Sequence, residues 1–220
     1  MVINNRMNEL LRRAVEAGSL EDLVAAVRGG ANVNARDEGG ETALTKATAI
    51  NQGPERALAC VRCLLRMGAR VSEEKPDGGL GTSVHQAAAN GYKEALKELL
   101  AADGKVALEV FDDMGRTPLI CAVEGGHVEE ACLLLDAGSD VDANDVEMVG
   151  NTALSTAVQE RNLAMVELLL KHGADPTVPG WMQLSALDRA RDWTADGTAP
   201  ELRRIFDLLD EEAKRRKLQR

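Results

Sequence analysis

The sequence predicts an all-α solenoid of about six helix-turn-helix repeats joined by projecting β-hairpin or turn loops. A motif of Thr, a variable residue and an aliphatic residue recurs at intervals of 33 to 40 residues, and its last copy begins with Ser. The copies are Thr42-Ala43-Leu44, Thr82-Ser83-Val84, Thr117-Pro118-Leu119, Thr152-Ala153-Leu154 and Ser185-Ala186-Leu187. A second marker closes apolar helical stretches at Gly30-Ala31, Gly68-Ala69, Gly138-Ser139 and Gly173-Ala174. Such a period is typical of stacked units, because one unit alone cannot bury its apolar face.

The first helix of each unit is predicted from its ends. Thr117 suits the N-cap position, where its hydroxyl accepts a hydrogen bond from a free backbone amide. Pro118 suits the first helical position, where a missing N–H costs nothing. Small residues such as Ala87-Ala88 allow close approach to neighbouring helices, and a glycine such as Gly126 ends the helix in a left-handed conformation.

The second helix of each unit is predicted from the aliphatic run that precedes the Gly-Ala or Gly-Ser marker. In the fourth unit this run is Cys132-Leu133-Leu134-Leu135. The spacing of these aliphatic residues places them on one face of the helix, which packs across its own unit and against the next unit. A polar turn such as Asp112-Asp113-Met114-Gly115 then leads outward to the next first helix.

The two end units differ from the rest. The first unit lacks the Thr motif and carries Arg12, Arg13 and Glu16, and the last unit is degenerate, so both are predicted to be polar caps. We expect one domain over residues 1–210 and a charged tail, 211–220, that continues the last helix. The predicted repeats span about 8–36, 37–76, 77–111, 112–146, 147–179 and 180–210.

Extra residues lengthen three connections, around 51–55, 72–76 and 194–200. Insertions in solenoids fall in loops on one face, often near the binding face. We favour neutral drift of a tolerant loop as the explanation of these extra residues.

Composition and charge exclude several partners. The formal net charge is −10 and the pI is near 4.9, which opposes binding to duplex nucleic acid or to an anionic membrane. Four Cys are too few for a disulfide scaffold, and no apolar signal core or membrane-spanning run is found. We therefore expect a cytoplasmic protein. A nuclear location would follow if the basic cluster Lys214-Arg215-Arg216-Lys217, with Arg203-Arg204, is an import signal rather than a helix C-terminus.

The repeated unit resembles the ankyrin repeat, which carries the motif T-P-L-H-x-A. The most similar copy runs from Asp112 to Ala143, and the resemblance covers about residues 8 to 210. It implies a stack with a ridge of hairpin tips and a concave surface lined by first helices, which together bind another protein. The implied role is an adaptor, an inhibitor or an assembly chaperone, expected as a monomer. The alternative is a regulatory or small-molecule-sensing subunit that uses the inter-helix loops and the Gly-rich hairpin at 77–82.

Residues with catalytic or metal-binding chemistry are explained by packing. Cys60 and Cys63 form a C-x-x-C motif without a second pair, and both fall at core positions of a second helix. His85 and His127 resemble family residues that make hydrogen bonds within and between repeats, and His172 lies at a helix end. We therefore expect no catalytic residue, no metal and no cofactor, and the protein is not expected to be an enzyme.

The predicted contact surface follows the tip positions of units four to six, where Met or Trp recurs although no core residue is needed. An apolar centre with a polar edge is typical of a binding patch. The predicted partner-binding residues are Asp113, Met114, Arg116, Glu124, Met148, Val149, Asn151, Glu160, Trp181, Met182 and Trp193. In a second interpretation, Trp181 and Trp193 fold inward and seal the C-terminal cap.

An acidic segment adds a hypothesis about the partner. Residues 101–160 contain 13 acidic and 2 basic residues. Such a face either steers a partner with a basic surface or keeps the protein soluble.

Overall fold

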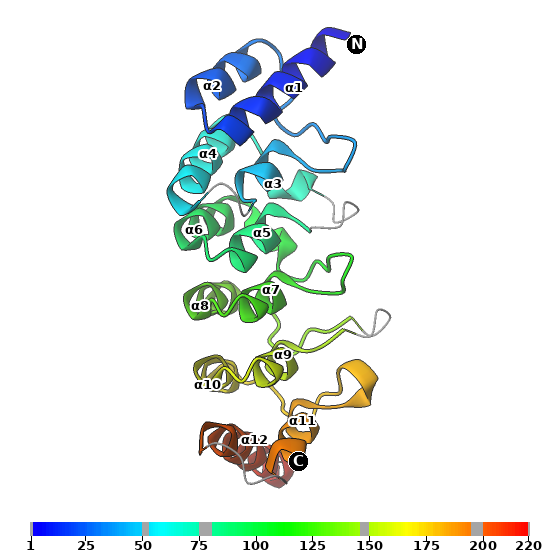
Figure 1. Cartoon of the computed structure of the whole chain (residues 1–220). Helices are drawn as coiled ribbons and strands as arrows, with labels where there is room; N and C mark the ends of the chain where they lie inside the picture. Colours follow the sequence, from blue (N-terminus) through cyan, green and yellow to red (C-terminus); the bar gives the residue numbers. More distant parts are fainter. Residues whose placement is uncertain (1, 50–52, 75–80, 146–149, 195–199, 220) are drawn as a thin grey trace.

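The structure is a computed structural model that describes residues 2–49, 53–74, 81–145, 150–194 and 200–219. Within these residues, twelve α-helices form six pairs that stack into an elongated solenoid (Figure 1). The first helices of the pairs are α1 (Val2–Ala17), α3 (Ala43–Ala47), α5 (Ser83–Ala89), α7 (Pro118–Glu124), α9 (Ala153–Gln159) and α11 (Ala186–Thr194). The second helices are α2 (Leu20–Arg28), α4 (Pro54–Arg66), α6 (Lys93–Ala102), α8 (Val128–Ala137), α10 (Leu163–Lys171) and α12 (Pro200–Gln219).

The stack has two columns. Each first helix contacts the first helix of the next pair, and each second helix contacts the next second helix. This arrangement confirms the predicted all-α solenoid. The expected β-hairpins take the form of turns: in the described part of the chain the only β-pairing is an isolated antiparallel bridge between Pro179 and Ser185.

The connections between helices also contain short 3-10 helices. These are η1 (Val71–Glu73), η2 (Gly104–Ala107) and η3 (Trp181–Gln183). Glycines with positive φ follow four of the second helices, α2, α4, α8 and α10, as at Gly138, whose φ of 108° favours a residue without a Cβ. The predicted glycine C-caps are therefore confirmed at this position.

Buried threonines begin four of the first helices. The hydroxyls of Thr42, Thr117 and Thr152 each accept a hydrogen bond from the backbone amide three residues later. At Thr82 the cap is reciprocal, because the His85 imidazole Nδ1 accepts from the Thr82 amide at 3.1 Å. A cap of this kind contributes about 1 kcal/mol to the free energy of unfolding.

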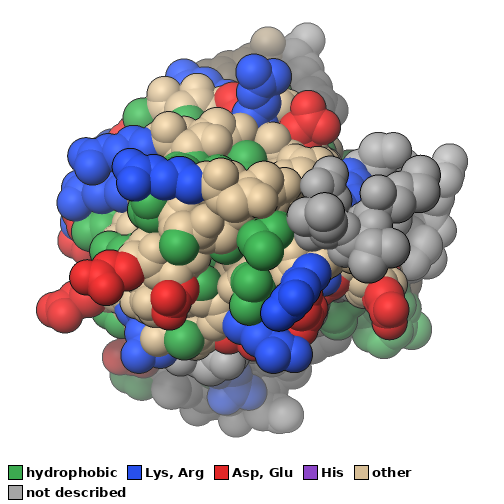
Figure 2. Space-filling model, turned by 90° about the horizontal axis from the view of Figure 1, so that it is seen from above, with side chains coloured by type: hydrophobic (Ala, Val, Ile, Leu, Met, Phe, Trp, Pro, Cys, Tyr) green, Lys and Arg blue, Asp and Glu red, His purple; other side chains and the backbone are tan. Residues whose placement is uncertain are grey.

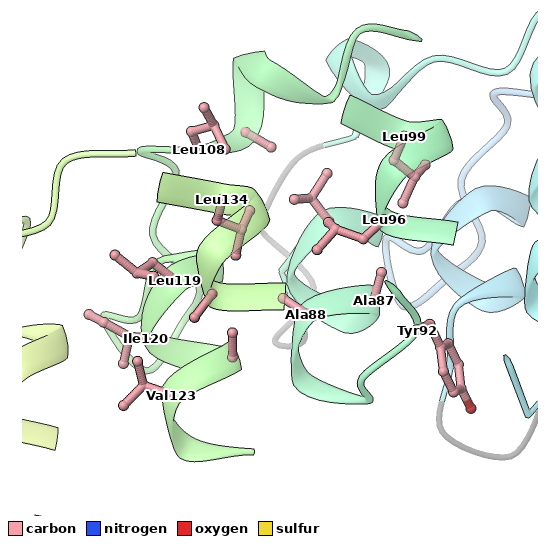
Figure 3. Close-up of a cluster of buried hydrophobic side chains, with 14 of the residues drawn as sticks. Ala87, Ala88, Tyr92, Leu96, Leu99, Leu108, Leu119, Ile120, Val123 and Leu134 are labelled. Atoms are coloured by element: carbon pink, nitrogen blue, oxygen red, sulfur yellow. The ribbon is translucent and has the colours of Figure 1, made fainter. Parts of the chain in front are cut away.

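The core is one continuous aliphatic layer between the two columns. Ala87 and Ala88 on α5 are fully buried, and their small side chains let neighbouring first helices approach closely. Leu96 of α6 and Leu134 of α8 reach the same layer from the second column, beside Leu119 of α7 (Figure 3). The buried side chains of this layer are almost all aliphatic: Tyr92 is the one aromatic residue among those described.

Hydrogen bonds also join the connections of successive units. The Asn34 side-chain oxygen accepts from the Arg70 amide at 3.0 Å, and the Glu109 carboxylate accepts from the Asp140 amide at 2.8 Å. These partners lie 36 and 31 residues apart, which is about one repeat. Each unit is therefore held to the next through the backbone of its connection as well as through its helices.

A buried carboxylate lies between the second and third units. Glu74, directly after η1, accepts hydrogen bonds from the hydroxyls of Thr42 and Thr45 at 2.9 Å each. Its other oxygen accepts from the Ser83 amide and hydroxyl at 2.8 Å each. Burial raises the pKa of Glu74, although these four donors favour its ionised form. The lengthened connection around 72–76 thus supplies a carboxylate that joins the N-termini of α3 and α5.

The N-terminal end of the stack differs from the polar cap that the sequence predicts. Arg12 and Arg13 lie toward Arg36 and Glu9, where they make hydrogen bonds. Seen from above, hydrophobic side chains gather near the middle of this end, flanked by charged ones (Figure 2). An apolar groove of about 500 Å³ lies there. Its lining residues are Met7, Leu10, Arg13, Ala14, Ala17, Asp22, Ala25, Ala26 and Gly29.

The C-terminal end is closed by α12. The buried residues of this helix are Leu202, Ile205, Leu209 and Ala213. Arg216 donates to the carbonyl oxygens of Gly173 and Ala174, at the end of α10. Arg216, part of the predicted basic cluster, therefore stabilises the preceding helix end. Among the described helices, none is both long and apolar enough to cross a bilayer.

We expect Glu74→Ala to lower the free energy of unfolding by about 2 kcal/mol, because four buried donors lose their acceptor. Urea unfolding followed by circular dichroism measures this loss. The matched control is Glu73→Ala, since Glu73 is the exposed neighbour in η1 and should stay within about 0.5 kcal/mol of the wild type. Equal effects of the two substitutions would contradict the assigned role of Glu74.

Candidate functional site

The turns before the first helices project on one side of the solenoid (Figure 1), and two of these turns carry exposed apolar side chains. Met114 lies in the turn before α7 and is 66% exposed. Trp181 and Met182 lie in η3, before α11, and are 50% and 63% exposed. Exposed large apolar residues on projecting turns contribute nothing to the core, so they are candidates for contact with another molecule.

The turn that carries Trp181 is fixed by polar contacts. The Trp181 amide donates to the Asn151 side-chain oxygen at 3.2 Å, and the Trp181 carbonyl oxygen accepts from the Arg189 guanidinium at 3.2 Å. Arg189 also donates to Asn151, which links the turn to α11 and to the start of the preceding unit. Two successive residues, Met182 and Gln183, have positive φ values of 60° and 58°. This strained backbone is held by its surroundings and turns Trp181 and Met182 outward.

The turn that carries Met114 is fixed in a different way. One oxygen of Asp112 accepts from the amides of Met114 and Arg116 at 2.9 Å each. The Arg116 guanidinium then donates twice to the other oxygen, at 2.9 and 2.7 Å, and once to Glu124 at 2.7 Å. The Asp112 side chain is fully buried, so Arg116 supplies its counter-charge. Met114 projects from this turn with most of its surface open to solvent.

The predicted site residues therefore fall into two groups. Asp113, Met114, Glu160, Trp181 and Met182 are exposed on turns or at the end of a first helix. Arg116, Glu124 and Asn151 are joined to other side chains and support the turns. Met148 and Val149 lie outside the described residues, as does the side chain of Trp193 in α11.

The exposure of Trp181 also bears on the interpretation of this residue as a cap. A tryptophan that sealed the end of the stack would be buried, whereas half of the Trp181 surface is open to solvent. The apolar residues of α12 close the end instead. The sequence does not indicate that Trp181 is exposed while α12 closes the end of the stack, because α11 and α12 depart from the repeat pattern.

The other residues whose side chains could serve in catalysis or metal binding have mostly structural roles. Cys60 is buried in the core and Cys63 packs against it. Burial raises the pKa of both thiols, which favours the unreactive protonated form. His127 contacts the Ala89 carbonyl oxygen of the preceding unit at 3.1 Å.

The buried imidazole of His85 has a shifted pKa. Its Nδ1 accepts from the Thr82 amide, so Nε2 carries the proton and donates to the carbonyl oxygens of Val110 and Arg116 at 3.0 and 3.2 Å. Burial lowers the pKa of His85 to about 4. The imidazole is therefore neutral at physiological pH and joins α5 to the following turn.

Comparison with known families identifies the repeat. The sequence profile of ankyrin repeats, in three copies, matches residues 11–109, 49–145 and 84–179. A mouse protein, the B-cell lymphoma 3 protein homolog, is 40% identical over 111 residues, which are 50% of this chain. The chain spans only a quarter of that relative's length, since the match covers 25% of it.

Solved structures share the same architecture. An ankyrin repeat domain from Acinetobacter baumannii has a TM-score of 0.74 and 28% identity, and the match covers 92% of this chain and 96% of that one. The human ASB11 ankyrin repeat domain has a TM-score of 0.71 and 27% identity, with 92% and 81% coverage.

We expect acid to destabilise the protein through His85. Because the folded pKa is about 4 and the unfolded pKa is 6.5, the unfolded chain binds the proton more tightly. The contribution of neutral His85 is complete above pH 6.5, is lost progressively as the pH falls from 6.5, and is gone below about 4. From pH 7.5 to pH 4.5 this loss is about 2 kcal/mol.

Urea unfolding at the two pH values, in the wild type and in His85→Asn, measures this loss. The variant is expected to be less stable at pH 7.5 and to show the smaller decrease toward pH 4.5. A His85 imidazole that titrates near 6.5 in NMR spectra of the folded protein would contradict the assignment.

Proposed function

We propose that this chain, which belongs to the ankyrin repeat family, binds a partner protein as an adaptor, an inhibitor or an assembly chaperone without catalysis. The repeats of that family are protein-interaction modules. The contact is made by the projecting turns together with the adjoining ends of the first helices. One observation carries this proposal: Trp181 is half-exposed on a turn whose backbone is fixed.

The geometry of this turn supports a binding role. Trp is the residue type most enriched among interface hot spots, because one side chain buries a large apolar area at low entropic cost. Left-handed backbone at a non-glycine residue costs about 1 kcal/mol. Met182 and Gln183 both have this conformation, which presents Trp181 and Met182 to solvent although burial would stabilise the fold more. Strain of this kind is characteristic of ligand contacts.

A second contact point extends the proposed surface along the stack. Met114 is exposed in the turn before α7, two units before the turn of Trp181, and the turns before α7 and α11 project on the same side of the stack (Figure 1). Exposed Asp113 and Glu160 supply the polar edge, whereas Arg116, Glu124 and Asn151 act indirectly by fixing the turns. A partner that contacts both points spans three repeats.

The charge of the same units supports a partner with a basic surface. The acidic segment 101–160 includes α7, α8 and α9 with their turns, so the negative potential lies beside Met114. The four cysteines are free thiols, which supports a reducing compartment such as the cytoplasm. The alternative, a small-molecule-sensing subunit, depends on loops at 51–55, 77–82 and 194–200 that are only partly described, and no described contact favours it.

We expect Trp181→Ala to weaken partner binding by more than about tenfold, as for a hot-spot residue, and to change the melting temperature little. Affinity capture from native lysate with quantitative mass spectrometry compares the wild type with Trp181→Ala and Leu218→Ala. Leu218 is the matched control, because it is an exposed apolar residue of α12 outside the proposed surface.

Proteins enriched by the wild type and by Leu218→Ala should be depleted with Trp181→Ala. Equal recovery with all three baits would refute the proposed surface. A large fall in the melting temperature of Trp181→Ala would instead assign this residue to the fold.

We also expect association with the captured partner to slow as salt is raised from about 50 to 500 mM, because charges steer the encounter, whereas dissociation should change less. Surface plasmon resonance measures both rates. An association rate indifferent to salt would assign the acidic segment to solubility alone.

A further inference from the structure

Three side chains with different metal-ligating atoms meet in the column of second helices. Cys132 and Asp136 lie one turn apart on α8, and His172 caps the C-terminus of α10 in the next unit. The thiol sulfur, a carboxylate oxygen and an imidazole nitrogen all lie within 4.8 Å of one another. This cluster lies in the column of second helices, whereas the proposed partner surface is formed by the turns beside the first helices (Figure 1).

The sequence alone predicts a structural role for His172 at a helix end and no metal site. The cluster was not apparent there because Cys132 and His172 lie 40 residues apart in the sequence. Only the packing of α8 against α10 brings them together.

The geometry points to a site for a zinc-class divalent ion, held by Cys132, Asp136 and His172. Thiolate, imidazole and carboxylate are the three ligand types that zinc binds in proteins, at about 2.0 to 2.3 Å. Tetrahedral coordination at those bond lengths places neighbouring ligand atoms about 3.5 Å apart. The Cys132 sulfur lies 3.7 Å from the Asp136 oxygen, so these two ligands already have the required separation.

The surroundings suit a cation. Asp136 is exposed and the other two residues are half-buried, so the site opens to solvent and a water can occupy the fourth position. Asp136 belongs to the acidic segment 101–160, whose negative potential concentrates cations. The positive charge of the neighbouring Lys171 favours the thiolate form of Cys132. Metal binding replaces the proton that the thiol donates to Asp136, because a coordinating thiol is deprotonated.

An ion in this site would join two adjacent units. Cys132 and Asp136 belong to the fourth unit and His172 to the end of the fifth. The bound ion would therefore cross-link α8 to α10 and stabilise that part of the stack, because the unfolded chain does not hold the three ligands together.

Titration of the full chain with Co²⁺ tests this inference directly, because Co²⁺ reports its ligands spectroscopically. We expect saturable binding of one ion per chain, a thiolate-to-cobalt charge-transfer band in the near ultraviolet and visible bands of tetrahedral intensity. Zn²⁺ should displace the cobalt and abolish both signals.

Variants identify the ligands. Cys132→Ser should remove the charge-transfer band, and His172→Gln should weaken Co²⁺ binding by about tenfold or more, as expected when a ligand is lost. Cys63→Ser is the matched control, because Cys63 is also a half-buried thiol on a second helix. It should bind Co²⁺ as the wild type does.

Thermal unfolding gives a second readout, independent of any partner. Zn²⁺ at a hundredfold excess over its dissociation constant should raise the melting temperature by about 5 °C in the wild type and in Cys63→Ser, but not in Cys132→Ser. Unchanged Co²⁺ affinity in His172→Gln, or a charge-transfer band that survives Cys132→Ser, would overturn the site. Neither result depends on whether Trp181 binds a partner.

Discussion

A helix of five to seven residues is not stable alone in water, and this constraint governs the whole solenoid. The first helices α3, α5, α7 and α9 have this length, so each makes too few internal hydrogen bonds to offset its nucleation. Their stability comes from neighbours on three sides: the preceding first helix, the following one and the second helix of the same pair. The short length of these helices also explains small buried residues such as Ala87 and Ala88, because only a close approach of neighbouring helices buries so short a helix.

The same constraint explains the polar groups buried at the start of each short helix. An orphan amide is costly where water is excluded, so the N-terminus of each helix has its own acceptor. The acceptor is the hydroxyl of Thr117 at the start of α7, and the His85 imidazole accepts from the Thr82 amide before α5. The Glu74 carboxylate accepts from the Ser83 amide and from the Thr42 hydroxyl. The acceptors differ in chemistry, but each joins a helix start to the turn or the unit beside it.

The fold was predictable from the sequence because its signals are local. The N-cap at Thr117, Pro118 at the first helical position and the glycine at 138 each act within a few residues of their own position, and the repeat multiplies them. The candidate site was less predictable. The link from Asn151 to Trp181 joins residues about one repeat apart, and so do the contacts of Glu74 with Thr42 and Thr45. No spacing rule indicates which polar side chain turns inward. Arg116 illustrates the difficulty, since its guanidinium neutralises a buried carboxylate although its place in the turn suggests a contact residue.

The nearest-neighbour pattern of contacts has an evolutionary consequence. Because each helix pair packs mainly on the pairs before and after it, duplication or loss of one interior unit changes a single junction and leaves the others intact. The two ends are not equivalent in this respect. The Leu202, Ile205 and Leu209 face of α12 closes one end, whereas the apolar groove beside Met7 and Leu10 leaves the other end with a face onto which a further pair could stack. A pair stacked on that face would leave every existing junction unchanged, because it would contact only the first pair.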